Sequence, residues 1–337
     1  AGHQALRAVI QATAEAPSRP NAPMVRGLAF DALVDAAATA ARGDEVLALL
    51  AERLGAPDGA PCVLGVASWN RLIVAVRDAR GEVALEAREL PAGQIRLPAH
   101  AVVSPAMRAR LAGCARIAVL APGPYFGAPR LLDDEVAWSY RSGHTPVAAP
   151  LLPPRELVVS DVAPPDALQL PRLHRFEPRV GGELLSGMAA TPARVLERMT
   201  DASLIVIVAH GFTDVSEPSA ASLVLSAGPG GDYLLTASKV QAARLANAPA
   251  VVLAGCDAGR VQVTTEPWSL ATSFLQAGAR TVIAPTEPVP DDSADQVFRA
   301  LVDRLRSGDD PAVVLASERR LLGPSAAWLS SIVVFDR

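Results

Sequence analysis

Short apolar runs alternate with helix-forming segments along the C-terminal half of this sequence. Runs rich in valine, isoleucine, leucine and alanine have the pattern of strands buried on both faces of a sheet. They cover residues 157–162, 204–209, 250–255 and 280–284, with further strands predicted at 222–225, 233–235 and 328–335. Helices are predicted at 191–199, 237–245, 268–276, 291–306 and 311–322. Strands that alternate with helices favour an α/β fold, a three-layer α/β/α sandwich with a mostly parallel central sheet.

The N-terminal half has a different pattern. Residues 4–56 have apolar positions at helical spacing, and a proline-rich stretch at 17–23 separates a first helix from a second. Strand patterns follow, with Asp78–Gly81 as a hairpin turn between two of them. These strands are predicted at 62–68, 72–76, 83–90 and 116–120. We therefore expect an N-terminal helical region, 1–57, and one α/β domain, 62–337, with a hairpin-rich part (62–156) before its core (157–337).

The composition excludes several classes of protein. Half of the 337 residues are hydrophobic and a fifth are charged, so a large core is available and wholesale disorder is excluded. The formal net charge is −4 and the basic residues are scattered, which argues against a nucleic-acid partner. No apolar run approaches 18 residues and no secretory leader is present, so we expect no membrane partner and a cytoplasmic location.

The cysteines and histidines are few and scattered. Cys62, Cys114 and Cys256 cannot all pair and lie far apart, which argues against a disulfide scaffold and favours a reducing compartment. We expect the first two to be buried as small apolar side chains. The histidines are isolated from one another and from the cysteines, so no metal site is expected.

One histidine and one cysteine follow directly after predicted strands. The run 204–209 leads into His210-Gly211, and the run 250–255 leads into Cys256. Because the carboxyl ends of parallel strands meet at one edge of a sheet, we expect the two side chains to lie next to each other. Nucleophilic catalysis by cysteine requires at least a thiol and a neighbouring imidazole that can accept its proton.

These segments resemble the CHAT-domain peptidases of the caspase-like clan, relatives of caspases, separase and gingipains. The resemblance covers roughly residues 62–337 and is strongest after 200. It rests on the ordered segments 209–212 with Ser219 and 223–225, 251–259, 274–284, 288–292 and 328–335. The 46-residue spacing of His210 and Cys256 is near the spacing of about 50 in caspases. Tyr125-Phe126-Gly127 and Glu287 depart from the usual family pattern.

The resemblance implies a caspase-like sandwich and a cysteine endopeptidase. Cys256 would attack the peptide carbonyl as a thiolate, and His210 would move the proton. The backbone N–H groups of Gly211 and Cys256 would form the oxyanion hole. The reaction needs no cofactor. The implied partners are a specific protein substrate and a regulatory protein, in a bacterial signalling or defence pathway.

The substrate-binding residues are less sharply indicated. Relatives that cut after basic residues can place an acid two positions before the cysteine, where this sequence has Ala254. Four acidic residues nevertheless lie near the expected rim of the site. We therefore expect the enzyme to prefer substrates with a basic residue before the scissile bond. These acids are Asp214, Asp257, Glu287 and Asp291. Asp257 equally suits a turn residue, and Asp291 equally suits the start of a helix.

Two other functions remain open at this stage. One is a catalytically inactive CHAT-like scaffold or sensor that binds partner proteins; the presence of both catalytic residue types weighs against it. The other is an α/β-hydrolase with a cysteine nucleophile. That fold needs a histidine after the nucleophile in chain order, and no histidine follows His210 in this sequence.

Overall fold

The structure is a computed structural model that describes residues 2–17, 21–56, 59–91, 94, 96–142, 153–212, 222–261 and 268–337. The chain divides into two compact units, residues 1–145 with 263–267 and residues 146–262 with 268–337. Each unit is described by itself. The helices predicted at 4–56 and the strands predicted at 62–90 belong to the same compact unit. The domain boundaries expected from the sequence remain a prediction.

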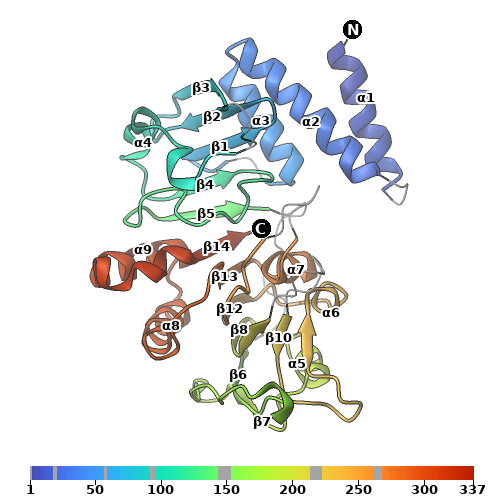
Figure 1. The fold of residues 1–337 in the computed structure, drawn as a ribbon, viewed down its shortest axis with the longest axis vertical. Helices are drawn as coiled ribbons and strands as arrows, with labels where there is room; N and C mark the ends of the chain where they lie inside the picture. Colours follow the sequence, from blue (N-terminus) through green and yellow to red (C-terminus); the bar gives the residue numbers. More distant parts are fainter. Residues whose placement is uncertain are drawn as a thin grey trace. The chain divides into compact units, whose positions relative to one another are not determined.

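The first unit packs helices against a five-stranded sheet (Figure 1). Its strands follow the order β3-β2-β1-β4-β5, in which β1 to β3 are antiparallel and β4 and β5 run parallel to β1. The strands are β1 (Val63–Ser68), β2 (Arg71–Arg77), β3 (Val83–Glu89), β4 (Ile117–Leu120) and β5 (Trp138–Arg141). The helices are α1 (Gly2–Glu15), α2 (Ala22–Thr39), α3 (Gly43–Leu54), η1 (Ala99–Ala101) and α4 (Pro105–Leu111). Helix α4 and strand β5 were not predicted from the sequence.

A glycine in β1 lets helix α3 close onto the sheet. A Cβ atom on Gly65 would lie 2.7 Å from Cδ2 of Leu47 and 2.9 Å from Cδ1 of Leu50. Both leucines are almost fully buried. The hydrophobic face of α3 therefore packs directly on the backbone of the sheet, because no side chain separates them.

Cys62 and Cys114 form a disulfide, so the expectation that they are unpaired is wrong. Fifty-two residues separate them in the sequence. They meet because β1 and β4 pair in parallel, with Val63 opposite Ala118, and the two cysteines lie just before these two strands. The argument for a reducing compartment loses its basis, since disulfides persist mainly in oxidising environments.

We expect this disulfide to stabilise the fold measurably. Closing a loop of 52 residues restricts the unfolded chain, which predicts a loss of about 4 kcal/mol of unfolding free energy on reduction. Urea unfolding with and without dithiothreitol measures the difference. The Cys62→Ala/Cys114→Ala variant is the control, because its stability should not respond to the reductant. Equal stability of the wild type in both buffers would contradict the prediction.

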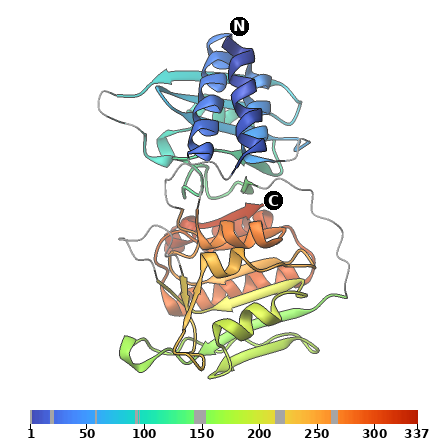
Figure 2. The same ribbon diagram turned by 90° about the vertical axis from the view of Figure 1, so that its right-hand side faces the viewer.

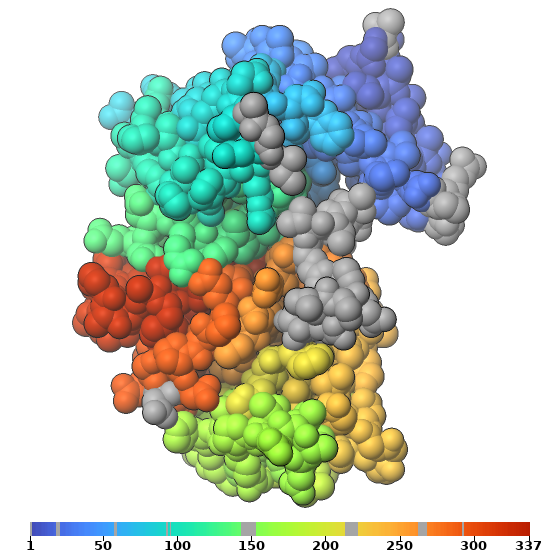
Figure 3. Space-filling view, in the orientation of Figure 1, coloured from blue at the N-terminus to red at the C-terminus, as the bar shows by residue number. Residues whose placement is uncertain are grey.

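The second unit is a three-layer sandwich around a six-stranded sheet, as the sequence predicted. The strand order is β14-β13-β12-β8-β6-β7, and all neighbours are parallel except β13 and β14. The strands are β6 (Glu156–Val162), β7 (Glu183–Gly187), β8 (Leu204–Val208), β12 (Ala250–Ala254), β13 (Thr281–Pro285) and β14 (Ile332–Asp336). Helices α5, α6 and α7 cover one face, and α8 and α9 lie side by side on the other (Figures 1 and 2). In the space-filling view, the orange-to-red residues of α8 and α9 form one continuous surface (Figure 3).

These helices follow the predicted pattern, and a side chain caps the start of each of them except α8. They are α5 (Pro192–Arg198), α6 (Ala237–Gln241), α7 (Leu270–Ala277), α8 (Asp291–Arg306) and α9 (Pro311–Leu322). The side chain of Thr191 caps α5, with Pro192 at its first position, as expected. Ser269 and Thr272 form a capping box at α7. No helix in the described part of the chain is long and apolar enough to cross a membrane.

The closing strand starts later than the sequence predicted. Residues Gly323–Ser331 form the 3₁₀ helix η3, so the strand begins at Ile332 rather than at Trp328. Strand β7 was not predicted, and a second short 3₁₀ helix, η2 (Asp166–Leu168), lies between β6 and β7. The loop expected at 145–155 falls mostly outside the described residues.

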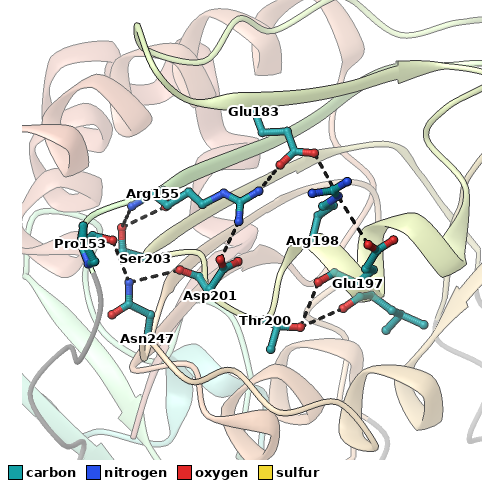
Figure 4. Close-up of polar contacts among 10 residues, drawn as sticks. Pro153, Arg155, Glu183, Glu197, Arg198, Thr200, Asp201, Ser203 and Asn247 are labelled. Carbon is teal, nitrogen blue, oxygen red and sulfur yellow. Dashed lines mark hydrogen bonds and ion pairs between the residues drawn. The ribbon is translucent and has the colours of Figure 1, made fainter.

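An ion-pair network fixes the amino ends of the parallel strands (Figure 4). Arg155, just before β6, pairs with Glu183 at the start of β7 and with Asp201. Ser203 Oγ accepts a hydrogen bond from the Arg155 N–H at 3.0 Å, and Asn247 donates to the carbonyl of Asp201 at 3.3 Å. These contacts hold the strands together at the edge of the sheet opposite to their carboxyl ends.

Candidate active site

His210 and Cys256 occupy equivalent positions beyond two paired strands. Strands β8 and β12 are parallel neighbours, and Val208 lies opposite Ala254. Each candidate catalytic residue comes two positions after its member of this pair. The strand ends therefore bring the ring and the thiol to the same edge of the sheet.

The chain leaves the main sheet at His210. Strand β9 (His210–Phe212) pairs with β10 (Ser222–Val224), which pairs with β11 (Leu234–Thr236) in a small antiparallel sheet. His210 is opposite Val224 in this sheet. The histidine is thus held between a buried parallel strand on one side and a hairpin strand on the other.

Both candidate catalytic side chains line one pocket of about 40 Å³. This volume exceeds what one water molecule requires, so the site is hollow. His210 and Cys256 are both half-buried. The other described lining residues are Leu173, His174, Phe176, Val208, Ala209, Ala254, Gly255, Val289, Asp291, Ala294, Asp295 and Phe298.

Two glycines allow the strand ends to approach each other closely. A Cβ atom on Gly211 would lie 1.7 Å from the carbonyl oxygen of Cys256 and 3.2 Å from its backbone nitrogen. A Cβ atom on Gly255 would lie 2.5 Å from the carbonyl oxygen of Ala209 and 3.5 Å from the backbone nitrogen of Gly211. Only glycine fits at these two positions, because the atoms in the way belong to the backbone.

Cys256 is followed by a tight turn in which the backbone of Asp257 is in the left-handed region. Asp257 has φ of 56°, and Gly259 donates a hydrogen bond of 2.7 Å to the carbonyl of Pro285 at the end of β13. A Cβ atom on Gly259 would lie 3.0 Å from the carbonyl oxygen of Ala284. The cysteine therefore sits at the head of a turn that packs against β8 on one side and β13 on the other.

A backbone carbonyl fixes the orientation of the imidazole. Nε2 of His210 lies 2.8 Å from the carbonyl oxygen of Pro171. Because a carbonyl only accepts, Nε2 carries the proton and Nδ1 is left as the acceptor of a neutral ring. The Cys256 thiol donates a long contact of 3.8 Å to the carbonyl of Val289. No sequence pattern predicted this contact, because Pro171 lies 39 residues before the histidine.

The segment that carries Pro171 is anchored by buried polar contacts. Ser160, which is fully buried in β6, accepts a hydrogen bond from the Phe176 N–H and donates one to its carbonyl, both at 3.0 Å. Glu156 and Arg306 form an ion pair whose side chains are both 9% exposed, and Arg306 donates to the carbonyl of Glu177 at 2.9 Å. These bonds tie the segment to β6 and to α8.

The predicted substrate-binding acids are placed differently from one another. Asp291 lines the pocket, whereas Asp257 and Glu287 are not among its lining residues. Asp214 lies outside the described residues. Asp295 also lines the pocket; it is one helical turn after Asp291 on α8, a spacing that could have revealed it. Among the described residues, no group of three or more metal-ligating side chains could hold a metal ion.

Asp257 is held in an unfavourable environment. Burial raises the pKa of Asp257 above its usual value; nearby Arg260 opposes the rise and Glu287 adds to it. Within the described part of the chain, Oδ1 of Asp257 is buried without a hydrogen-bond partner, and the closest guanidinium nitrogen of Arg260 is 3.8 Å away. The carboxylate therefore weakens the fold when it is charged.

The sequence matches the family model of the CHAT domain over residues 125–328, which is more than half of the chain. The protein belongs to the CHAT domain family, as the resemblance of its motifs implied. No curated protein matches the sequence.

Similar solved structures include two crystal structures of the Saccharomyces cerevisiae separase–securin complex. They have 10% sequence identity to this chain and TM-scores of 0.43 and 0.42. The match covers 66% of this chain but only 16% and 15% of the solved chains. This protein therefore corresponds to a small part of those much longer chains.

Replacing Gly211 by alanine should distort the site. The added methyl group meets the Cys256 backbone, so we expect a loss of about 3 kcal/mol of unfolding free energy. Chemical unfolding of Gly211→Ala beside Gly230→Ala measures it. Gly230 is the control because a Cβ atom there meets nothing within 4 Å. Equal stability of the two variants would show that the close approach is absent.

Asp257→Asn should stabilise the protein at pH 7. The raised pKa means that the folded state favours the protonated carboxyl, so stability falls as the pH rises from the unfolded pKa of about 3.9 through the folded value. Asparagine removes this penalty. The melting temperature of the variant should exceed that of the wild type by more at pH 7 than at pH 3. A difference that does not change with pH would contradict the electrostatic explanation.

Proposed function

We propose that this protein is a cysteine endopeptidase that hydrolyses a peptide bond in a protein substrate with the dyad His210 and Cys256. The observation that carries the proposal is the shared pocket, in which the imidazole and the only unpaired cysteine of the chain lie beyond paired positions of β8 and β12. Membership in the CHAT domain family supports the same reaction class.

The first half of the reaction forms an acyl-enzyme. The thiol proton of Cys256 passes to Nδ1 of His210, and Sγ attacks the carbonyl carbon of the scissile bond. The N–H groups of Gly211 and Cys256 would bind the resulting oxyanion, and each such donor contributes roughly 3–4 kcal/mol in comparable enzymes. The imidazolium then gives its proton to the leaving amine, and a thioester remains on Cys256.

The second half of the reaction uses water. His210, again neutral, takes a proton from a water molecule that attacks the thioester carbonyl. The tetrahedral intermediate then collapses: the C–S bond breaks, His210 returns its proton to the sulfur, and the new carboxyl end of the substrate and the Cys256 thiol are released. The carbonyl of Pro171 would orient the imidazole through both halves and stabilise the imidazolium, because it accepts from Nε2 in either protonation state.

The reaction implies a protein substrate, and the family resemblance adds a regulatory protein. We propose a specific protein substrate and a regulatory protein; the separases of the solved structures are bound to securin. The cytoplasmic location expected from the sequence remains a prediction, and the Cys62–Cys114 disulfide weighs against it. The inactive-scaffold alternative has no specific structural observation in its favour.

The reactivity of Cys256 tests the dyad without a known substrate. With Cys62 and Cys114 in a disulfide, iodoacetamide reports on Cys256 alone. We expect His210→Gln to slow alkylation at pH 7 at least roughly tenfold, because the imidazole can take the thiol proton as the sulfur attacks the reagent. His100→Gln, in the first unit, is the control. Equal alkylation rates in all three proteins would contradict a coupled dyad.

Peptidase activity is tested by comparing proteomes. Lysates treated with wild type should contain new protein termini that are absent after treatment with Cys256→Ala. Termini that form equally with both proteins, or no new termini although alkylation shows an activated thiol, would favour a binding module over a peptidase.

A further inference from the structure

We infer that the pocket beside Cys256 binds the side chain of the substrate residue that precedes the scissile bond. This side chain is apolar, of the leucine, methionine or norleucine type. The inference rests on the proposed endopeptidase function and specifies its substrate. It differs from the basic preference expected from the sequence, because the acids of the described structure are not available to a basic side chain in this pocket.

The walls nearest to the dyad are apolar. Val208 and Ala254 lie opposite each other at the ends of β8 and β12, two positions before His210 and Cys256. Phe176 and Phe298, each 2% exposed, and Ala294 add further carbon surface. A hydrocarbon chain entering beside Cys256 would bury its surface against these groups, which is the main source of affinity in such a pocket.

The carboxylate of Asp295 already has a cationic partner. Arg299, one turn later on α8, pairs with Asp295 at 2.8 Å. The guanidinium of Arg299 also donates to the carbonyl of Arg175 at 2.7 Å and lies 4.8 Å from the ring centre of Phe176. Because three contacts hold Arg299 in place, a substrate lysine or arginine would have to displace it in order to reach Asp295.

Asp291 does not replace Asp295 as a binding site for a cation. It is exposed and is the first residue of α8, where a negative charge interacts with the helix dipole. Exposed ion pairs of this kind contribute little, since water screens them. A basic side chain in the pocket would lose hydration from its charged end, and the described lining residues offer it no buried carboxylate that is free of Arg299.

Peptides that differ in one residue test this inference. Ala-Ala-Ala-X coumarin amides, with X as norleucine or lysine, present the same four-carbon chain without and with a charge. We expect a kcat/KM for norleucine at least roughly tenfold above that for lysine, and a similar ratio in the rates at which the matching acyloxymethyl ketones label Cys256.

Variants of α8 test the cause. Arg299→Gln frees the Asp295 carboxylate, so the ratio of lysine to norleucine cleavage should rise about tenfold. Arg304→Gln is the matched control: Arg304 lies on the same helix, pairs with Asp309, and its side chain is 38% exposed against 39% for Arg299. The double variant Asp295→Asn/Arg299→Gln should lose the gain, because the freed charge is gone.

The outcomes separate this inference from the proposed function. Cys256-dependent cleavage that favours lysine in the wild type, or that leaves the ratio unchanged in Arg299→Gln, would overturn the apolar pocket and leave the endopeptidase intact. No Cys256-dependent cleavage or labelling with any peptide would refute the endopeptidase and the pocket inference together.

Discussion

The close backbone approach between Gly211 and the Cys256 turn is the constraint on which the candidate site depends. A residue with a side chain at position 211 or 255 would push the two strand ends apart, because the nearest atoms are main-chain carbonyls that cannot rotate away. Burial of the apolar central residues of β8 and β12 stabilises this close approach of the two strand ends, since those residues are fully buried. The position of the thiol relative to the imidazole is thus a consequence of core packing.

The orientation of the imidazole depends on a different part of the chain. Pro171 belongs to a loop that Ser160 and the Glu156–Arg306 pair hold against β6 and α8. A buried ion pair is weak evidence for stability, but breaking one by removing a single partner is strongly destabilising. This loop therefore holds one geometry, and both the tautomer of His210 and one wall of the pocket follow from it.

The sequence predicted the features that depend on local pattern. Apolar runs ending in glycine located β8 and β12, and with them His210 and Cys256, because a buried strand and a tight turn each leave a signature within a few residues. The contact of Pro171 with His210 and the Cys62–Cys114 bond join residues far apart in sequence, and no short-range signal marks them. Ile332 starts the last strand later than expected because the apolar residues before it pack equally well as a 3₁₀ turn.

The covalent link between Cys62 and Cys114 has a practical consequence. It encloses β1, β2, β3 and α4 in one ring of the chain. A single nick anywhere inside that ring would leave the two fragments joined, and they would migrate as one band on a gel run without a thiol. Processing events in this part of the molecule would become visible only after reduction.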